Sequence, residues 1–493
     1  MGIIMENSIQ YGQKNLNILY DCDVLVVGGG FPGVCAAVGA ARAGAKTVLV
    51  ERNGVLGGQA AEVDTWGLDG FVDNYGKQII RGIPWELLQR TVKEGGSDTL
   101  WTRINMDTLE NKGVEPALQE IGLDAYIPYI ETGTYMNPFN DQYINSNAYR
   151  YAAQCMLEEA GVEILIDMPV IDVLLEGNKV SGIVIQGEFE KFAILAKVVV
   201  DTTQQAIVCA FAGKTIAHRK IYMGTLPRVS GVDIEELLQY IGQTQEQWLL
   251  RPMAGKTAEP CEMRELVRGG NPLAIHGFET ALMQAVEKDK AFEPLLRKDT
   301  SQLMFFYEHD GLGAYWTFGD NFDRVMADDP IAMSRAVLAG RKQQWLQHKF
   351  FTSYIPGFSR AQLVDTYPHI SKAYEQSMEP GNFTEYDVTA KEITEGVTDR
   401  KDVILRIMGH PRSNNCPRGW LLPYGSLIPK GLDGILVTGK PACRKIHYIA
   451  TCAAVGQAAG VAAAIAAISN KTVRQAEIKD ILQQLENQDA IVK

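Results

Sequence analysis

Residues 21–60 constrain the fold of this chain more than any other stretch. They open with an apolar run, residues 24–27, whose β-branched side chains suit a strand buried on both faces. Three glycines follow in the spacing G-x-G-x-x-G, and small residues fill most of positions 34–43. The pattern predicts a strand, a tight turn and a helix that lies close on the sheet.

Each glycine has its own physical task. Gly28 permits the tight turn, Gly30 lets a pyrophosphate approach with no Cβ in the way, and Gly33 allows close packing of helix on strand. The helix N-terminus adds N–H donors and a partial positive charge. A second predicted strand, residues 47–50, ends in Glu51, which can accept the hydroxyls of a ribose. Together these features predict a dinucleotide site; a glycine-rich turn in an unrelated α/β protein would leave Glu51 unexplained.

A second glycine pair follows the acid, in Asn53-Gly54-Val55-Leu56-Gly57-Gly58-Gln59. Here the chain resembles the FAD-binding flavoproteins of the glutathione-reductase-like superfamily, in which ER…LGG lies against the cofactor. NAD-only Rossmann domains seldom carry this second pair, so the resemblance implies FAD. It also implies cofactor contacts from both glycine segments, namely Phe31, Pro32, Arg52, Gly57, Gly58 and Gln59.

Residues 162–200 predict a strand, a three-stranded meander and a buried strand that ends in Asp201. In the superfamily this order returns the chain to the FAD sheet, and the position near Val170 offers backbone groups to the adenine. Relatives often have D-A-T-G-D where this chain has Asp201-Thr202-Thr203-Gln204-Gln205. The resemblance there implies contact through the backbone of Thr202 and Thr203.

The C-terminal part returns to the family pattern. Relatives have PY.SLIP, NLLVAGR and TC.A.GQAAG.AAA, which match residues 423–429, 434–440 and 451–464. The last segment is a predicted helix whose N-terminus, in this superfamily, faces the flavin; its dipole of about half a unit charge favours the anionic reduced ring. Packing on neighbouring elements also explains its small residues, although Gly456-Gln457 indicates that something approaches the backbone. The implied cofactor contacts are Gly439, Cys452, Gly456 and Gln457.

The densest group of acids and bases stands just before this helix and includes Arg444, His447 and Tyr448. Relatives usually carry an arginine at the position of His447, whereas a histidine can pass protons near neutral pH. His410, shortly before the return to the FAD sheet, is a further catalytic candidate. A purely structural role for each of these histidines stays open.

The predicted fold is α/β: a glutathione-reductase-like Rossmann domain for FAD, with a parallel sheet and an antiparallel meander, and an inserted α+β substrate or cap domain. In the cap, residues 355–358 and 383–388 resemble the PGF…LTEDDV pattern of FAD-dependent oxidoreductases, but the intervening R-x-S-R is absent. The predicted boundaries are 20–75, 146–215 and 420–470 for the FAD domain, 76–145 and 216–419 for the cap, and 471–493 for a terminal helix.

Composition limits the partners. The net charge of −12 gives no basic field, which opposes a nucleic-acid partner. No apolar run approaches the about 18 residues of a membrane helix, so no membrane partner is predicted. Eight cysteines without a C-x-x-C pair oppose an iron–sulfur, zinc or dithiol site, and no metal is predicted. The predicted compartment is the cytoplasm, and a homo-oligomer stays open.

The predicted function is an FAD-dependent oxidoreductase that moves a hydride between flavin N5 and a carbon of a small polar organic substrate, by dehydrogenation or double-bond reduction. FAD should bind non-covalently, because no suitably placed His or Cys follows Gly58. Without a second dinucleotide motif, the electron partner is the substrate itself, dioxygen, a diffusible nicotinamide or a carrier protein. Two alternatives stay open: a flavin-dependent tRNA-modifying protein and a non-catalytic binding module that keeps the FAD fold.

Overall fold

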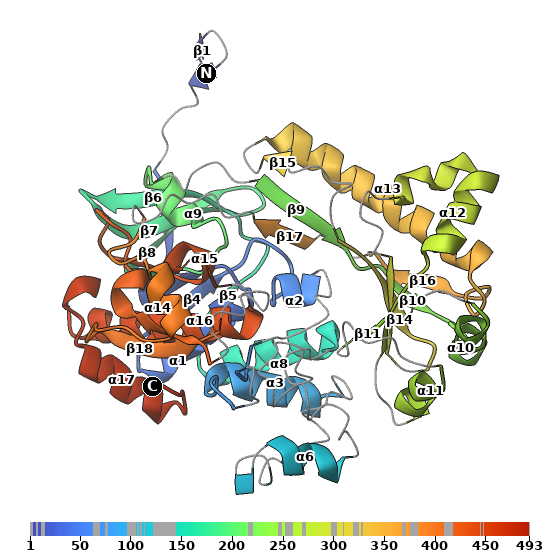
Figure 1. Cartoon of the computed structure of the whole chain (residues 1–493). Coiled ribbons are helices and arrows are strands. Elements are labelled where there is room, and N and C mark those ends of the chain that lie inside the picture. Colours follow the sequence, from blue (N-terminus) through green and yellow to red (C-terminus); the bar gives the residue numbers. More distant parts are fainter. Residues whose placement is uncertain are drawn as a thin grey trace.

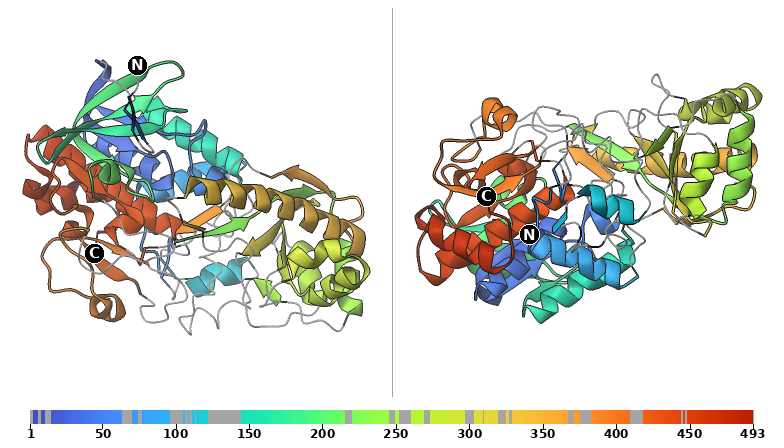
Figure 2. Two further views of the ribbon diagram at one scale, coloured as in Figure 1. Left: turned by 90° about the horizontal axis from the view of Figure 1, so that it is seen from above. Right: turned by 60° about the horizontal axis from the view of Figure 1, so that its bottom comes forward.

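The fold is described from a computed structural model of the 493-residue chain. Within the described residues the strands form two large sheets at opposite ends of the molecule (Figure 1, Figure 2). A separate hairpin, β1 (Ile3–Met5) and β2 (Ser8–Gln10), stands at the N-terminus. The structure describes residues 3–5, 8–10, 15–62, 70–73, 77–95, 105, 108, 111–112, 114–121, 144–214, 220–244, 249–251, 260–268, 273–296, 303–308, 310–318, 325–326, 329–366, 371–374, 383–408, 418–443, 445–446 and 448–492.

The first sheet contains seven described strands in the order β5-β4-β3-β8-β7-β6, and β20 also pairs with β8. β5, β4, β3, β8 and β20 run parallel, whereas β7 is antiparallel to β8 and β6 is antiparallel to β7. The strand bounds are β3 Asn17–Val27, β4 Thr47–Val50, β5 Glu163–Leu165, β6 Val170–Glu176, β7 Lys179–Gln186, β8 Lys191–Asp201 and β20 Ile435–Val437.

β8 joins the parallel strands of this sheet to its antiparallel strands. Along one side it pairs with β3 from Phe192 to Asp201. Along the other side it pairs first with β7, up to Leu195, and then with β20, from Val199. The sequence predicted a meander strand and a separate buried strand, whereas the structure has one continuous strand, because no Gly or Pro interrupts residues 191–201.

Two helices of small residues, α1 (Phe31–Arg42) and α16 (Ile449–Ile468), pack on each other beside this sheet. A Cβ on Gly456 would lie 2.2 Å from Pro32 O, and a Cβ on Gly460 would lie 2.0 Å from Ala36 O. Only glycine therefore permits this approach at either position. The sequence indicated that something approaches the helix backbone at Gly456, and the structure shows that it is α1.

α16 also corrects the expectation that no segment is apolar enough to cross a membrane. Among the described residues it is the one helix that is long and apolar enough to cross a membrane, with a mean hydropathy of 1.7. In the structure 83% of the apolar window is buried inside the protein, where α16 packs on α1, β3 and β8. A buried core helix of a soluble protein can have the same length and apolar composition.

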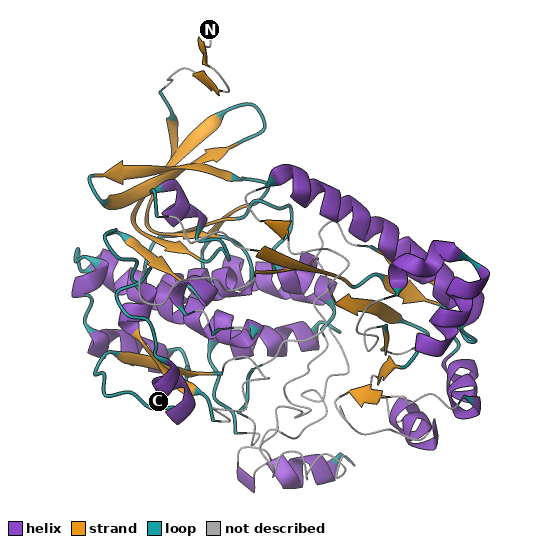
Figure 3. Cartoon of the chain, turned by 45° about the horizontal axis from the view of Figure 1, so that its top comes forward, coloured by secondary structure: helices purple, strands orange, loops and turns teal. Residues whose placement is uncertain are grey.

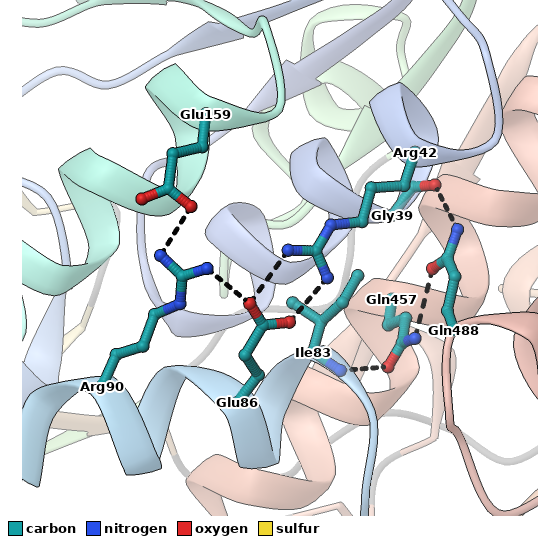
Figure 4. A network of polar contacts seen from close by, with 8 residues as sticks. All are labelled: Gly39, Arg42, Ile83, Glu86, Arg90, Glu159, Gln457 and Gln488. Atoms are coloured by element: carbon teal, nitrogen blue, oxygen red, sulfur yellow. Dashed lines mark hydrogen bonds and ion pairs between the residues drawn. The ribbon is translucent and has the colours of Figure 1, made fainter.

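A chain of amide hydrogen bonds joins the C-terminus to this core (Figure 4). Gln457 of α16 accepts from Ile83 N (3.2 Å), at the start of α3 (Ile83–Lys93), and donates to Gln488 Oε1 (3.2 Å). Gln488 follows α17 (Ile478–Asn487) and donates to Gly39 O of α1 (3.0 Å). A neighbouring ionic network links α1, α3 and α8 (Ser146–Glu159) through Arg42, Glu86, Arg90 and Glu159.

Two segments within the predicted cap boundaries contact elements of the predicted FAD domain. One is α3, which lies against α8, α16 and α1. The other is residues 383–408, where Glu385 N donates to Ile428 O (2.8 Å) and β18 pairs with β19. The elements of this second group are α14 Ala390–Glu395, β18 Val403–Ile407, β19 Trp420–Pro423, η4 Tyr424–Leu427 and η5 Val473–Gln475. Other helices of the described chain are α2 Gln59–Glu62, α6 Val114–Glu120, α9 Ile207–Phe211 and α15 Gly439–Ala442.

The second sheet is the α+β insertion. Its described strands follow the order β11-β12-β13-β14-β10-β16, and β9 pairs with β14, β15 and β17. The long helix α13 (Pro330–Tyr354) covers one face (Figure 3), where Phe351 stacks on Tyr315 of β14 at 4.5 Å between ring centroids. The two sheets together confirm the predicted fold class. The remaining bounds are β9 Lys220–Thr225, β10 Arg228–Ser230, α10 Ile234–Gln243, β11 Leu249–Arg251, α11 Pro260–Arg268, β12 Leu273–His276, α12 Glu279–Lys288, η3 Lys290–Leu295, β13 Met304–Tyr307, β14 Gly313–Phe318, β15 Val325–Met326, β16 Gln362–Asp365 and β17 Ser371–Tyr374.

Candidate functional site

The carboxyl ends of four adjacent parallel strands define the candidate site. β4, β3, β8 and β20 end at Val50, Val27, Asp201 and Val437, and each is followed by one of the segments singled out in the sequence. In open α/β sheets ligands bind in the crevice at this edge. The structure therefore brings together four predicted segments that lie far apart in the sequence, residues 28–33, 51–59, 202–203 and 439.

The turn after β3 depends on glycine at two positions. Gly28 has φ +100°, and a Cβ on Gly33 would lie 1.7 Å from Gly28 O. The hydroxyl of Thr202 fills the space beneath this turn, with Oγ1 2.9 Å from both Val27 O and Gly28 O. The sequence implied only a backbone contact for Thr202, but its side chain fixes the shape of the glycine turn.

Gly30 differs from these glycines because the protein itself leaves room for a side chain there. Its φ is −67°, and an added Cβ would meet its nearest non-adjacent atoms, Pro32 Cδ and Gly58 Cα, at ordinary distances of 3.7 and 3.8 Å. The second glycine pair lies against this position, since Gly57 N donates to Gly29 O (2.8 Å). We call Gly29, Gly30, Gly57 and Gly58 the glycine cradle.

The start of α1 borders the glycine cradle. Pro32 has no N–H and Val34 N donates to Gly30 O (2.9 Å), so the first-turn N–H groups without an acceptor inside the helix are those of Phe31 and Gly33. The Phe31 side chain is buried against Tyr149, with ring centroids 5.3 Å apart. Phe31 can therefore offer a ligand its backbone but not its ring.

Glu51 is buried beside the glycine cradle with its carboxylate held by two backbone bonds. Oε2 accepts from Gly29 N (2.6 Å) and Oε1 accepts from Asn53 N (2.9 Å). The sequence analysis missed Gly29, where a Cβ would lie 2.9 Å from Glu51 Cβ. The available signal was that the motif position between Gly28 and Gly30 is also a glycine. Arg52 is exposed, and Met168 N donates to Glu51 O (3.0 Å), which brings the segment leading to Val170 alongside.

Asp201, which the sequence left without a role, organises the next loop. Its Oδ1 accepts from Thr203 N (3.0 Å) and Thr203 Oγ1 (2.7 Å), and its Oδ2 accepts from Val208 N (2.8 Å). Thr203 Oγ1 in turn accepts from Ile207 N (2.9 Å), at the start of α9. Complete burial of Asp201 raises its pKa to about 6.

We expect the stability of the protein to report this titration. Because the folded pKa lies above the about 3.9 of an exposed aspartate, the folded state binds the proton more tightly. The resulting stabilisation, about 3 kcal/mol, is complete below pH ~4 and is lost as the pH rises through ~6. The free energy of urea unfolding should therefore fall over this range in wild type relative to Asp201→Asn. A difference between the two proteins that stays constant with pH would contradict the assignment.

The start of α16 lies near the same edge of the sheet. The helix begins at Ile449, with Tyr448 as its N-cap, and not at Thr451 as the sequence predicted. Cys452 lies in its first turn, where its Sγ would be 3.9 Å from a Cβ on Gly439. The residue is half-buried, and desolvation of its thiol raises the thiol pKa to about 12. Tyr448 is buried. The other catalytic candidates, Arg444, His447 and His410, lie outside the described residues.

Gly456 and Gln457, predicted as cofactor contacts, have packing roles. Gly456 lies against Pro32 of α1, and the amide of Gln457 bonds to Ile83 and Gln488. Gln457 contacts Gly39, which is about 13 Å along α1 from Gly30. These contacts account for both residues by packing within the protein, and their contact with the cofactor stays a prediction.

The parallel sheet, the glycine turn at its carboxyl edge and the buried acid after the second strand define a Rossmann-type dinucleotide-binding protein. A family model described as FAD dependent oxidoreductase matches residues 23–372 and 409–485. The chain belongs to this family, which confirms the resemblance seen in the sequence. It is an enzyme with FAD as its cofactor.

Comparison with solved structures finds weaker similarity. A geranylgeranyl bacteriochlorophyll reductase-like protein from Thermoplasma acidophilum is 14% identical, with 95% of this chain and 82% of that chain covered and a TM-score of 0.40. GidA from Aquifex aeolicus is 14% identical, with 92% and 67% covered and a TM-score of 0.43. L-Amino acid deaminase from Proteus myxofaciens is 12% identical, with 94% and 93% covered and a TM-score of 0.40. No curated protein matches the sequence significantly.

Proposed function

We propose that this enzyme transfers a hydride between the flavin of FAD and a carbon of a small polar organic substrate. FAD supplies the two-electron chemistry, and the protein supplies binding, orientation and protons. The observation that carries the proposal is the glycine cradle. At Gly30 the protein leaves open a space that one Cβ would fill, directly before the N–H groups of α1.

The residues of the site divide the work of holding FAD. The N–H groups of Phe31 and Gly33 and the partial positive charge of α1 suit the pyrophosphate. Glu51, already oriented by Gly29 N, suits the adenosine ribose, and the backbone near Val170 suits the adenine. Gly439, Cys452 and the N-terminus of α16 suit the flavin ring, where the helix dipole would favour added negative charge.

We propose that the insertion supplies the second wall of the active site. Arg, His and Tyr side chains of the insertion are the groups that would recognise a polar substrate. One of these cations is already neutralised, because Arg228 of β10 pairs with Glu308 in the interior of the cap sheet. The cap tyrosine Tyr315 is likewise engaged, since its hydroxyl lies 3.2 Å from His348 Nδ1. A polar substrate therefore has to be recognised by other groups of the cap.

Acid precipitation should release all the flavin from the purified protein as free FAD. In the described part of the site the cysteine that borders the proposed flavin position is Cys452, a neutral thiol with a pKa of about 12. The released flavin is identified by chromatography, and the pellet is examined for residual yellow colour. Colour retained in the precipitate would contradict non-covalent binding; protein that neither contains nor takes up FAD would overturn the proposed function.

His447 is expected to donate or accept the proton that accompanies hydride transfer. It precedes α16 by two residues, at the helix end proposed to face the flavin. His447→Ala should retain FAD and fold but lose about 10²–10⁴-fold in turnover. His447→Arg restores charge without proton transfer, and should recover substrate binding more than rate. Rapid-mixing measurement of flavin reduction and reoxidation across pH tests this; a rate for His447→Ala within about threefold of wild type excludes the role.

A further inference from the structure

The longest described helix, α13 (Pro330–Tyr354), exposes large apolar side chains at a spacing of seven residues. Ile331, Leu338 and Trp345 are 63%, 62% and 55% exposed. We call these three residues the apolar stripe. A spacing of seven keeps side chains on one face of a helix and is the repeat by which two helices pack along a shared seam.

A parallel row of positive charge accompanies the apolar stripe. Arg335, Lys342 and Lys349 are exposed, and each stands four residues after a member of the stripe. We call these three the basic stripe. The helix contains four lysines and arginines and no acidic residue, in a chain of net charge −12. Beside Trp345 the surface has a hollow of ≈ 380 Å³, lined by Arg341, Lys342, Trp345, Leu346 and Lys349.

The buried face of α13 is more polar than a core-facing surface requires. Gln343, Gln344 and Gln347 are 7%, 2% and 0% exposed. Among the described residues, neither amide atom of Gln347 has a hydrogen-bond partner. The helix thus buries three amides beside its buried Phe350 and Phe351. It nevertheless leaves isoleucine, leucine and tryptophan exposed, which packing of the single chain does not favour. Burial against another molecule would remove the apolar stripe from water.

We propose that the apolar and basic stripes of α13 bind an acidic amphipathic helix of another protein. The apolar stripe supplies the seam, and the basic stripe selects carboxylates in the flanking positions of the partner. A second copy of α13 fits poorly, because antiparallel pairing about Leu338 would set Arg335 against Arg341. The surface belongs to α13 of the insertion, and none of its residues has a part in the proposed reaction, so the inference is independent of that reaction (Figure 2).

The test uses two synthetic three-heptad peptides with leucine at a and d, one with glutamate and one with lysine at e and g. Binding to the full-length holoenzyme is measured by fluorescence anisotropy at low salt. The glutamate peptide should bind with a Kd below about 100 μM, and the lysine peptide should not bind. Leu338→Glu should weaken binding at least about tenfold, whereas Val397→Glu, at an apolar site 54% exposed outside α13, should leave it unchanged.

Reversing the charge of the basic stripe provides the decisive experiment. The double variant Lys342→Glu, Lys349→Glu should lose the glutamate peptide and gain the lysine peptide, with flavin content unchanged in every variant. Equal binding of both peptides to wild type, or binding unaffected by Leu338→Glu, overturns the proposal. Two other results also overturn it: self-association abolished by Leu338→Glu, which would assign the face to a second copy, and Trp345-dependent binding to phosphatidylserine vesicles without peptide binding, which would assign it to a membrane.

Discussion

Gly30→Ala is expected to give a folded protein that has lost most of its affinity for FAD. The added Cβ meets protein atoms only at ordinary contact distances, and the backbone conformation of Gly30 suits any residue. The same Cβ occupies the space proposed for the pyrophosphate, with a cost in binding of about 10²–10³-fold from lost hydrogen bonds and steric contact. FAD titration and thermal melting of the apoprotein measure the two effects separately, and Gly30→Val should abolish the flavin colour altogether.

Gly33→Ala is the matched control for this experiment. Its Cβ would lie 1.7 Å from Gly28 O and 2.9 Å from Thr202 Oγ1, so the variant should fail to fold or melt far below wild type. The comparison then shows that Gly30 is a glycine because the ligand needs the space, whereas Gly33 is a glycine because the protein packs against it. A Gly30→Ala protein with wild-type affinity for FAD would refute the placement of the pyrophosphate at the glycine cradle.

The second large effect is expected at the contact between α1 and α16. In an ordinary helix interior, Gly→Ala stabilises by about 1 kcal/mol. At Gly456 and Gly460 the sign should reverse, with losses of at least about 3 kcal/mol, because the new Cβ would lie 2.2 Å from Pro32 O or 2.0 Å from Ala36 O. Gly39→Ala, whose Cβ would lie 3.1 Å from Gln457 O, should cost less.

Urea unfolding of the three variants, with FAD content measured in parallel, tests the graded series. If Gly456 contacted the cofactor instead of α1, Gly456→Ala would unfold like wild type and lose only its flavin. A stability order that does not follow the three distances would show that the helices can shift apart at little cost.

The local elements of the FAD domain were predictable from sequence because short-range patterns determine them. The β-branched run before Gly28, the strand that ends at Glu51 and the small residues of α16 each specify an element without reference to the rest of the chain. Family resemblance then supplied the order of those elements. The continuous β8 was missed because burial, not a turn signal, decides where a strand stops.

Side-chain roles set by distant contacts were not predictable. Nothing near Thr202 in the sequence shows that its hydroxyl lies under the Gly28 turn, 174 residues away. Gln457 has the letters of a family motif, yet its amide bonds to Ile83 and Gln488. The contacts of α3 with α8, α16 and α1, and of β18 with α16, were not predictable for a similar reason, because composition does not show which distant element covers an apolar face.

The hydrogen bond between Gln488 and Gly39 spans 449 residues of sequence, which has a consequence for biosynthesis. A ribosome that adds about 5–20 residues each second needs roughly 20–90 s to make the chain between them. For most of that interval the small-residue face of α1 has no α16 to cover it, because α16 begins at Ile449, whereas β3, β4 and β8 are complete by Asp201. The nascent enzyme therefore carries an uncovered α1 until α16 (Ile449–Ile468) has been made, and a chain terminated before that point is left with α1 exposed to chaperones and proteases.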